Sequence, residues 1–458
     1  MQLVKLTIEK NFSLRIALIG LLSMAYCQSG IAQDNSPYSR YGIGDLAHSM
    51  NALNRGMGRI TAGYTDFLSI NFSNPASYTS FQTLKEARST KLQSGRVIFD
   101  VGINYDVRIL RESDKPEKFT AQNAFFSYMQ VGMPLRTNWG LTFGIRPVSR
   151  ISYEIVTRER IQLSNSTDSI LTVYKGDGGA YLPNIGTAFK IGKKLSIGVN
   201  AGYMYGKKEY STRLGFQNDT IEYNPSSHLT NTHYGNFFFQ GGLQYKHTTK
   251  NKIIITGGAT GNLGTTLNAH EDRFVETFTR STTGIDGVLD SVYRQTDVKG
   301  TMKYPGSFTV GFTIGSEPEY KRSTWMFGAD FTATSWADYR YYGKTDYTQD
   351  TWQANIGGHF RPAPGKGYFS NVTYRAGVFG GPDYINTGQS LTQFGITFGM
   401  GLPLANYNRL AQGQATIVNL AFEYNKRGNN SNVLKEDLMR ISIGLSLSDL
   451  WFTKQKYE

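Results

Sequence analysis

One pattern repeats along most of the chain: apolar and polar or small residues alternate over about ten positions, and a turn follows. These segments exceed the roughly five or six residues of a common soluble strand, and a strand needs about nine to eleven residues to cross a bilayer. The pattern therefore predicts an all-β fold, a transmembrane antiparallel β-barrel. The segment at 97–107 shows the two faces clearly: Val97, Phe99, Val101, Ile103, Tyr105 and Val107 against Asp100, Gly102, Asn104 and Asp106.

About fourteen such segments can be counted, and a closed bacterial barrel is expected to have an even number of strands. The connections alternate between long and short, and short turns are periplasmic in this architecture. The sequence therefore predicts an outer-membrane protein with both termini in the periplasm. Gly192-Lys193-Lys194 is typical of a tight turn, and the longest predicted loop covers 265–303.

Composition excludes several other classes of protein. The chain has 50 glycines, 29 tyrosines and 27 phenylalanines among its 458 residues, and only 18% of its residues are charged. No run of about 18 apolar residues follows the N-terminal segment, which excludes a helical membrane bundle. The net charge of +13 is not gathered into a basic cluster, so nucleic acid is not an expected partner. Membrane lipid, lipopolysaccharide and acidic proteins fit the basic excess better.

The N-terminus has the features of a secretory signal peptide over 1–32. Lys5, Lys10 and Arg15 precede an apolar run, and small residues end at Ala32. A lipoprotein signal at Cys27 is the alternative, but the residue before this cysteine is not small. Cleavage after Ala32 leaves a mature chain without cysteine, so neither disulfides nor thiol chemistry are expected.

Residues 33–96 lack the alternating pattern, and the barrel is predicted over 97–458. We interpret 33–96 as an N-terminal hatch that plugs the barrel; a disordered periplasmic tail is the alternative. The hatch is favoured because the segment is rich in apolar residues that are costly to leave in water: Tyr38, Tyr41, Ile43, Leu46, Met50, Leu53, Met57, Ile60, Leu68, Ile70 and Phe72.

A Gly-Met-Gly element at 56–58 is followed by Asn74-Pro75-Ala76, and this combination resembles the N-terminal hatch of the FadL family of outer-membrane transporters. The segments at 36–42 and 443–452 resemble superfamily members from the Bacteroidota. The resemblance implies passive uptake of small hydrophobic compounds such as fatty acids, with lateral release where the third strand kinks inward. Only Asn74, Pro75 and Ala76 match hatch positions of the family.

The same superfamily contains members that do not transport, such as a shuttle protein of the type IX secretion system. Residues 453–458 also follow the last predicted strand, which departs from the family pattern. A second function therefore stays open: an accessory or structural barrel with a protein partner in an envelope assembly or secretion complex.

Pro147 lies within the third predicted strand, at 139–157. Proline cannot donate to the strand ladder, so Pro147 predicts a bulge or kink. The functional interpretation is a lateral gate for an apolar ligand, and the structural alternative is simply the end of a strand.

Several charged residues lie on or near the polar faces of the predicted strands. An arginine that faces lipid at mid-depth costs roughly 2–4 kcal/mol, so these side chains are expected to face the lumen. They could form a polar constriction, ion pairs with the hatch, or an ordinary hydrated wall. The residues are Asp100, Asp106, Arg108, Arg146 and Asp330.

The sequence offers no sign of catalysis or of metal binding. None of its six histidines belongs to a His-Glu-x-x-His motif, and no Gly-x-Ser-x-Gly motif occurs. We expect no enzyme activity, no metal and no cofactor. Aromatic residues are expected to form girdles at the membrane interfaces: Trp336, Tyr339, Tyr341, Tyr342, Tyr347 and Trp451.

Overall fold

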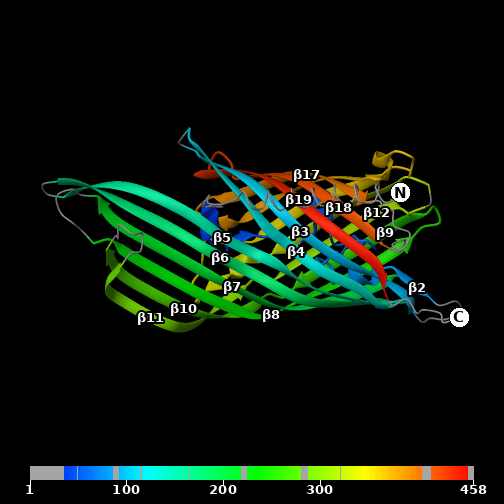
Figure 1. The fold of residues 1–458 in the computed structure, drawn as a ribbon, viewed down its shortest axis with the longest axis horizontal. Coiled ribbons are helices and arrows are strands. Elements are labelled where there is room, and N and C mark those ends of the chain that lie inside the picture. Colours follow the sequence, from blue (N-terminus) through cyan, green and yellow to red (C-terminus); the bar gives the residue numbers. More distant parts are fainter. Residues whose placement is uncertain are drawn as a thin grey trace, which may run out of the picture. The chain divides into compact units, whose positions relative to one another are not determined.

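The computed structural model describes residues 36–48, 50–85, 92–113, 116–163, 166–217, 224–279, 287–319, 321–404 and 414–451, so the predicted signal peptide lies outside them. Within these ranges, fourteen antiparallel strands close a barrel, which confirms the predicted fold (Figure 1). The last strand closes the wall by pairing with the first, from Leu434 opposite Glu112 to Trp451 opposite Gly95. The strands are β3 (Leu92–Glu112), β4 (Lys118–Arg136), β5 (Trp139–Leu163), β6 (Ser166–Ile191), β7 (Leu195–Gln217), β8 (Ser226–Thr248), β9 (Ile253–Asn262), β12 (Ser307–Ser316), β13 (Thr324–Thr334), β15 (Thr351–Arg361), β16 (Thr373–Asn386), β17 (Ser390–Leu404), β18 (Ala415–Arg427) and β19 (Leu434–Trp451).

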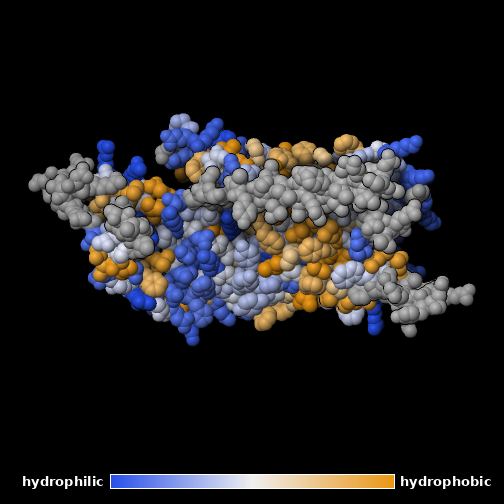
Figure 2. Space-filling model, in the orientation of Figure 1, coloured by the Kyte–Doolittle hydropathy of each residue, from blue (hydrophilic) through white to orange (hydrophobic). Residues whose placement is uncertain are grey.

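The two faces of the wall follow the alternation in the sequence, because successive side chains of a strand point to opposite sides. In β3, Phe99 and Ile103 are exposed on the outside, whereas Asp100 and Asp106 are buried on the inside. Apolar residues cover much of the outer face (Figure 2), among them Phe143, Phe189, Phe239, Phe312, Phe331 and Phe398. A closed barrel with such a face belongs in an outer membrane. No helix among the described residues is long and apolar enough to cross a membrane.

The hatch, which we define as the described residues from 36 to 85, lies mostly inside the wall, and its last strand pairs with the first barrel strand at the end of the barrel (Figure 1). Its elements are η1 (Pro37–Arg40), β1 (Asp45–Leu46), α2 (Ala52–Gly56), η2 (Pro75–Ser80) and β2 (Thr83–Lys85). Helix α2 packs against β17 and β18, and η2 packs against β6, β7 and β8. Side-chain oxygens of Asn51 and Asn74 cap α2 and η2. Strand β3 begins at Leu92, five residues before the predicted start of the barrel at 97.

The segment predicted as the longest loop, 265–303, is instead a β-hairpin. Strands β10 (Thr265–Thr279) and β11 (Gly287–Tyr304) pair with each other, and β10 also pairs with β8. The reason is geometric: β8 runs on beyond the end of β9 and leaves an edge that β10 completes. Together, β10, β11 and the distal parts of β5, β6, β7 and β8 form a sheet that we call the extension (Figure 1).

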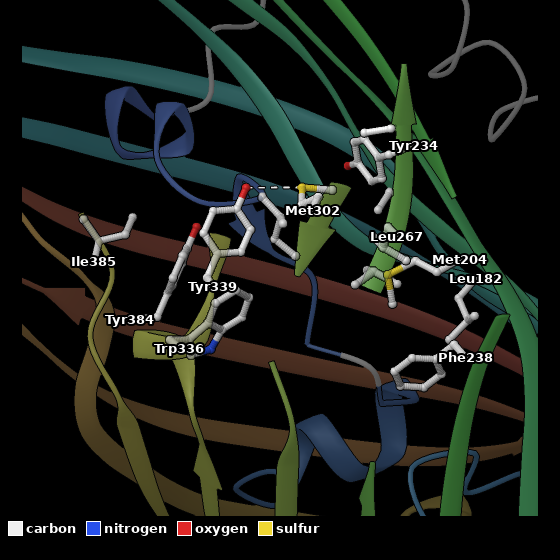
Figure 3. Packing of buried hydrophobic residues seen from close by; sticks show 14 of the residues in the cluster. Leu182, Met204, Tyr234, Phe238, Leu267, Met302, Trp336, Tyr339, Tyr384 and Ile385 are labelled. Carbon is white, nitrogen blue, oxygen red and sulfur yellow. Dashed lines mark hydrogen bonds between the residues drawn. The ribbon is translucent and has the colours of Figure 1, made fainter. Parts of the chain in front are cut away.

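The aromatic residues that follow β13 do not all form a girdle, and this corrects the prediction. Trp336 in η3 (Trp336–Asp338) is 3% exposed, and Tyr339 is fully buried. Both lie in a buried cluster with Tyr384 (Figure 3). After η3, the chain forms β14 (Arg340–Tyr341) and pairs with β11, which turns these rings inward. Tyr347 and Trp451 are exposed, and a further short turn, η4 (Tyr368–Asn371), follows β15.

Candidate functional site

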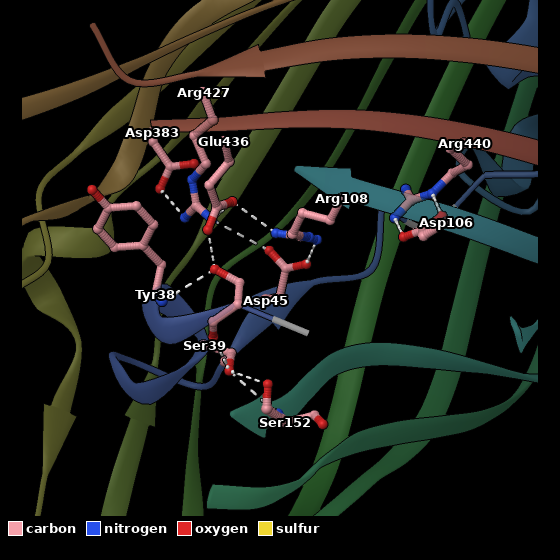
Figure 4. Close-up of polar contacts among 12 residues, drawn as sticks. Tyr38, Ser39, Asp45, Asp106, Arg108, Ser152, Asp383, Arg427, Glu436 and Arg440 are labelled. Carbon is pink, nitrogen blue, oxygen red and sulfur yellow. Dashed lines mark hydrogen bonds and ion pairs between the residues drawn. The ribbon is translucent and has the colours of Figure 1, made fainter. Parts of the chain in front are cut away.

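The contact between hatch and wall contains most of the buried charge near the lumen. Arg108 of β3 donates to Asp45 of the hatch at 2.5 Å and to Glu436 of β19 at 2.8 Å. Arg427 of β18 pairs with Asp383 at 2.8 Å and lies 3.5 Å from Asp45 (Figure 4). Burial by itself raises the pKa of Asp45, but the Arg108 and Arg427 guanidinium groups outweigh it and hold this pKa at about 2.

A second ion-pair group joins helix α2 and the residues after it to the wall. Arg59 donates to Glu423 of β18 at 2.6 Å, and Arg55 donates to the same carboxylate at 3.4 Å. The Arg59 guanidinium also stacks over the Phe379 ring at 3.5 Å. Burial lowers the pKa of Arg59 to about 10, so it stays charged at neutral pH. The pKa of His48 is well below its usual value because of burial and the nearby Arg59.

Wall carboxylates also bind backbone groups of the hatch. Asp330 of β13 accepts hydrogen bonds from the backbone N–H groups of Thr61, at 2.6 Å, and Ala62, at 2.9 Å. Asp100 accepts one from the N–H of Ile70 at 3.2 Å. The hatch is therefore anchored by neutral donors as well as by ion pairs.

Of the five predicted luminal charges, only Arg108 forms an ion pair with the described residues of the hatch, while Asp100 and Asp330 bind its backbone. The other two bind elsewhere. Asp106 pairs with Arg440 of the neighbouring strand, at 2.6 Å. Arg146 points its guanidinium toward the Phe72 ring of the hatch at 5.5 Å and donates to Gln240 at 3.4 Å. All five predicted charged residues are buried on the inside of the wall.

The Asn74-Pro75-Ala76 motif holds the hatch close to the backbone of the wall. The Asn74 amide donates to the carbonyl of Ala62 at 2.7 Å, and its oxygen accepts from the N–H of Ala76 at 3.1 Å. A Cβ added at Gly198 of β7 would lie 2.4 Å from the carbonyl carbon of Pro75. Only a glycine lets the two backbones approach this closely.

The sequence analysis missed most of the residues in the buried ion pairs, among them Glu423, Glu436, Arg55, Arg59 and Arg427. The wall residues in this group lie at inward positions of strands that the alternation did identify. A search for charges on the polar face of every predicted strand would have found Glu423. Its pairing with Arg59 has no local signal, because 364 positions separate the two residues.

At Pro147 the wall divides. Strands β4 and β5 pair only from Trp139 opposite Arg136 to Ile145 opposite Met129, and the register between β5 and β6 shifts just after Pro147. This shift is the predicted bulge. Beyond it β4 and β5 run unpaired with each other, and we call the opening between them the split.

The hatch occupies the base of the split. Strand β1 pairs with β5, with Asp45 opposite Arg150 and Leu46 opposite Ser149. The Ala47 N–H donates to the carbonyl of Val148 at 3.0 Å. From β5, the Arg150 guanidinium also reaches the Phe125 ring of β4, at 5.4 Å.

Near the split, the outer face of the wall changes from aromatic to charged side chains. Tyr181 lies opposite Pro147 and stacks on Tyr205 with 6.2 Å between ring centroids. Farther along β6 and β7, the ion pair between Lys207 and Asp177, at 2.8 Å, replaces these aromatic rings. Exposed charges are costly in hydrocarbon, so the wall leaves the membrane near Pro147. A cavity of about 510 Å³ lies here, lined among others by Phe125, Pro147, Tyr181, Tyr205 and Lys207.

One cavity inside the barrel has several charged groups in its lining. Its volume is about 290 Å³, and its lining includes Asp45, Arg59, Arg108, Arg427 and Glu436. Within the described ranges, no group of His, Cys, Asp and Glu side chains is arranged to hold a metal ion. The arrangement suits a permanent ionic contact between hatch and wall better than a pocket for an apolar ligand.

Comparison with solved structures shows the same barrel fold at low sequence identity. The Pseudomonas putida toluene transporter TodX is 15% identical with a TM-score of 0.52, over 88% of this chain and 99% of that one. A Pseudomonas aeruginosa FadL homologue is 12% identical with a TM-score of 0.49, over 90% and 100% of the two chains. No curated protein sequence matches. The model of the BamG family, however, matches residues 10–458, and the chain belongs to the BamG family.

Proposed function

We propose that this barrel is a non-transporting accessory subunit of the Bam outer-membrane assembly machinery. The family supports this proposal, since its match spans nearly the whole chain. The structural observation that carries it is the buried contact of Glu423 with Arg59 and Arg55. Leaving one member of a buried ion pair alone costs about 3–5 kcal/mol, so a passive channel would have to overcome several such costs to move its hatch.

The cavity that the described residues form inside the barrel suits an apolar ligand poorly. Its lining includes charged groups that would lose hydration or partners against a hydrophobic compound. The apolar side chains nearer the extension pack against the first residues of the hatch. This buried cluster includes Tyr38, Ile43, Trp336, Tyr339 and Tyr384 (Figure 3).

Passive uptake of hydrophobic compounds is the second candidate function, and one observation favours it. The wall does split after Pro147, and a cavity lined partly by Phe125, Tyr181 and Tyr205 lies at that place. Two observations argue against uptake. Strand β1 fills the base of the split. The exposed ion pair of Lys207 with Asp177 also favours a position in water for the part of the split beyond Pro147. A hydrophobic compound leaving there would enter water and not the membrane core.

In this proposal the end of β19 at Trp451 is periplasmic and the extension lies on the cell surface, because the short turns lie at the end of the barrel opposite the extension. The Gly192-Lys193-Lys194 turn between β6 and β7 is one of these short turns. The first residues of the hatch lie beside the distal part of β5, where the Ser36 N–H donates to the carbonyl of Ser152. The extension is then the part of the barrel that is free to contact other envelope proteins.

The experiment is purification of the tagged full-length barrel from its own membrane in mild detergent, followed by native mass spectrometry. We expect subunits of the assembly machinery at fixed stoichiometry and no lipid in the lumen. Depletion of the barrel should also lower the amounts of other outer-membrane barrels. A fatty-acid-like ligand that is lost when Asn74 and Pro147 are altered, with no protein partner, would overturn the proposal in favour of uptake.

A further inference from the structure

One edge of strand β5 is only partly paired by the rest of the described chain. The hatch satisfies the first part of this edge: Ala47 donates to the carbonyl of Val148, and Ser36 donates to the carbonyl of Ser152. Backbone groups of successive strand residues point to opposite edges. Because β5 and β6 stay in register from Ser149 onward, Glu154, Val156 and Arg158 turn their N–H and C=O groups to the same side as Ser152.

Beyond Ser152, no described residue makes a backbone hydrogen bond to that side of β5. Strand β4 has already separated, since its pairing with β5 stops at Ile145. We call the unpaired stretch of β5, from Tyr153 to Arg160, the open edge. An unpaired row of this kind is a template for another strand.

The open edge is longer than the segment that the expected signal cleavage would leave before Ser36. If the signal is cleaved after Ala32, three residues precede Ser36, and these reach at most about 10 Å. The open edge has eight residues and extends over about 26 Å. With that cleavage the residues before Ser36 do not span the open edge, which leaves room for a strand from another molecule.

The other edge of the extension, in β11, differs from the open edge of β5. Three register shifts interrupt the pairing of β11 with β10, and Asp297 has a φ of +55°. The Tyr342 N–H donates to the carbonyl of Thr301, and the Tyr342 hydroxyl donates to that of Val298. Bulges and caps of this kind prevent an edge from accepting strands. The open edge of β5 has no register shift.

We propose that the open edge of β5 binds an extended segment of a partner protein, as a strand that continues the row begun by hatch strand β1. The proposal rests on the proposed function, which supplies a partner in the assembly machinery. Backbone hydrogen bonds supply the affinity, and side chains on alternate positions supply the selectivity. One face of the bound segment would lie beside Tyr153 and Ile155 and should be apolar. Its other face would lie beside Glu154, Val156 and Arg158 and should be largely polar.

The test removes backbone donors from the open edge without changing the rest of the barrel. Proline is tolerated on an edge strand but has no N–H, so Glu154→Pro and Val156→Pro each delete a donor to the bound strand. Their matched controls, Glu154→Gln and Val156→Ile, keep the backbone donors and side chains of similar size. We expect the double proline variant to retain about ten-fold less of the partner in the purification above, which is about 1.4 kcal/mol. The controls should lose much less of the partner than the proline variants.

Heat-modifiable migration in gels shows whether the proline variants still form the barrel. Amide hydrogen exchange over 153–160 is the second measurement, on the wild-type barrel alone and in its complex. Slow exchange that appears only in the complex supports strand docking. Slow exchange in the isolated barrel monomer would mean that its own N-terminus covers the edge, and a proline-sensitive dimer would mean that a second copy does.

Either of these last results would overturn the proposal, as would full retention of the partner by a folded double proline variant. In that case the partner would bind elsewhere and the proposed accessory function would stand. Loss of the partner from every variant and from the wild type would instead count against the accessory function itself.

Discussion

The Arg59 guanidinium of the hatch and the Glu423 carboxylate of β18 meet at 2.6 Å, although 364 residues separate them in the chain. Neither side chain is more than 2% exposed. The carboxylate also accepts from Arg55, so one wall residue holds both cations of the segment that follows Asn54. A barrel whose hatch is fixed in this way is suited to a permanent closed state.

Replacing Glu423 by glutamine should release this part of the hatch. Two buried cations would lose their counter-charge, and the free energy of unfolding should fall by about 3–5 kcal/mol. Limited proteolysis of the folded barrel at increasing urea concentrations measures the release as earlier cleavage within the hatch.

Glu319→Gln is the matched control for this change, since Glu319 pairs with Lys252 and Arg322 at the surface. Surface pairs contribute little, so its hatch should be cleaved at the wild-type urea concentration. Equal behaviour of the two variants would show that the buried pair does not hold the hatch.

The contact of Asp45 with Arg108 should persist to low pH. The pKa of Asp45 is about 2 in the folded chain, below that of an unfolded aspartate. A lowered folded pKa stabilises the fold above the unfolded pKa, and this contribution is lost as the pH falls toward 2. His48, in the same cavity, has a pKa well below its usual value and stays neutral across physiological pH.

Protease cleavage of the hatch, measured from pH 7 downward, should therefore stay constant to about pH 4 and rise below it. Asp45→Asn should raise cleavage at pH 7 and flatten the curve. Release of the wild-type hatch between pH 5 and 6 would contradict the prediction.

Two adjacent glycines in β9 provide a steric test of the closed lumen. A Cβ at Gly258 would lie 1.8 Å from the carbonyl oxygen of Ala62 in the hatch, whereas a Cβ at Gly257 meets nothing within 4 Å. Gly258→Val should therefore displace the hatch and destabilise the barrel by about 1–3 kcal/mol, and Gly257→Val should not. Thermal unfolding and ion conductance in planar bilayers measure both effects; equal conductance in the two variants would argue against contact at Gly258.

Asp330→Ala should loosen the hatch without changing any ion pair. The substitution leaves the backbone N–H groups of Thr61 and Ala62 without their acceptor, at a cost of about 1–3 kcal/mol. Asp338→Ala, which removes an exposed carboxylate, serves as the comparison. Hydrogen exchange at Thr61 and Ala62 should be faster in the first variant only.

The strand pattern was readable because each barrel strand has one face toward lipid and one toward the interior, as Phe99 and Asp100 show in β3. The hairpin of β10 and β11 was not predicted because the pattern requires a strand with one apolar face and one polar face. Its strand β11 is exposed on both faces from Gly287 to Asp297, so it carries no alternation. The proline rule found the bulge at Pro147, but it could not indicate that β4 leaves β5 there.

The sequence alone determined the barrel, its number of strands and the inward position of Asp100, Arg108 and Asp330. These properties depend on the local alternation of residues, which the bilayer imposes on every strand. Only the tertiary structure decided which residues the inward charges meet, how β1 fills the base of the split, and where Trp336 lies. Those contacts join residues hundreds of positions apart, and their energies depend on burial and distance, which no local pattern records.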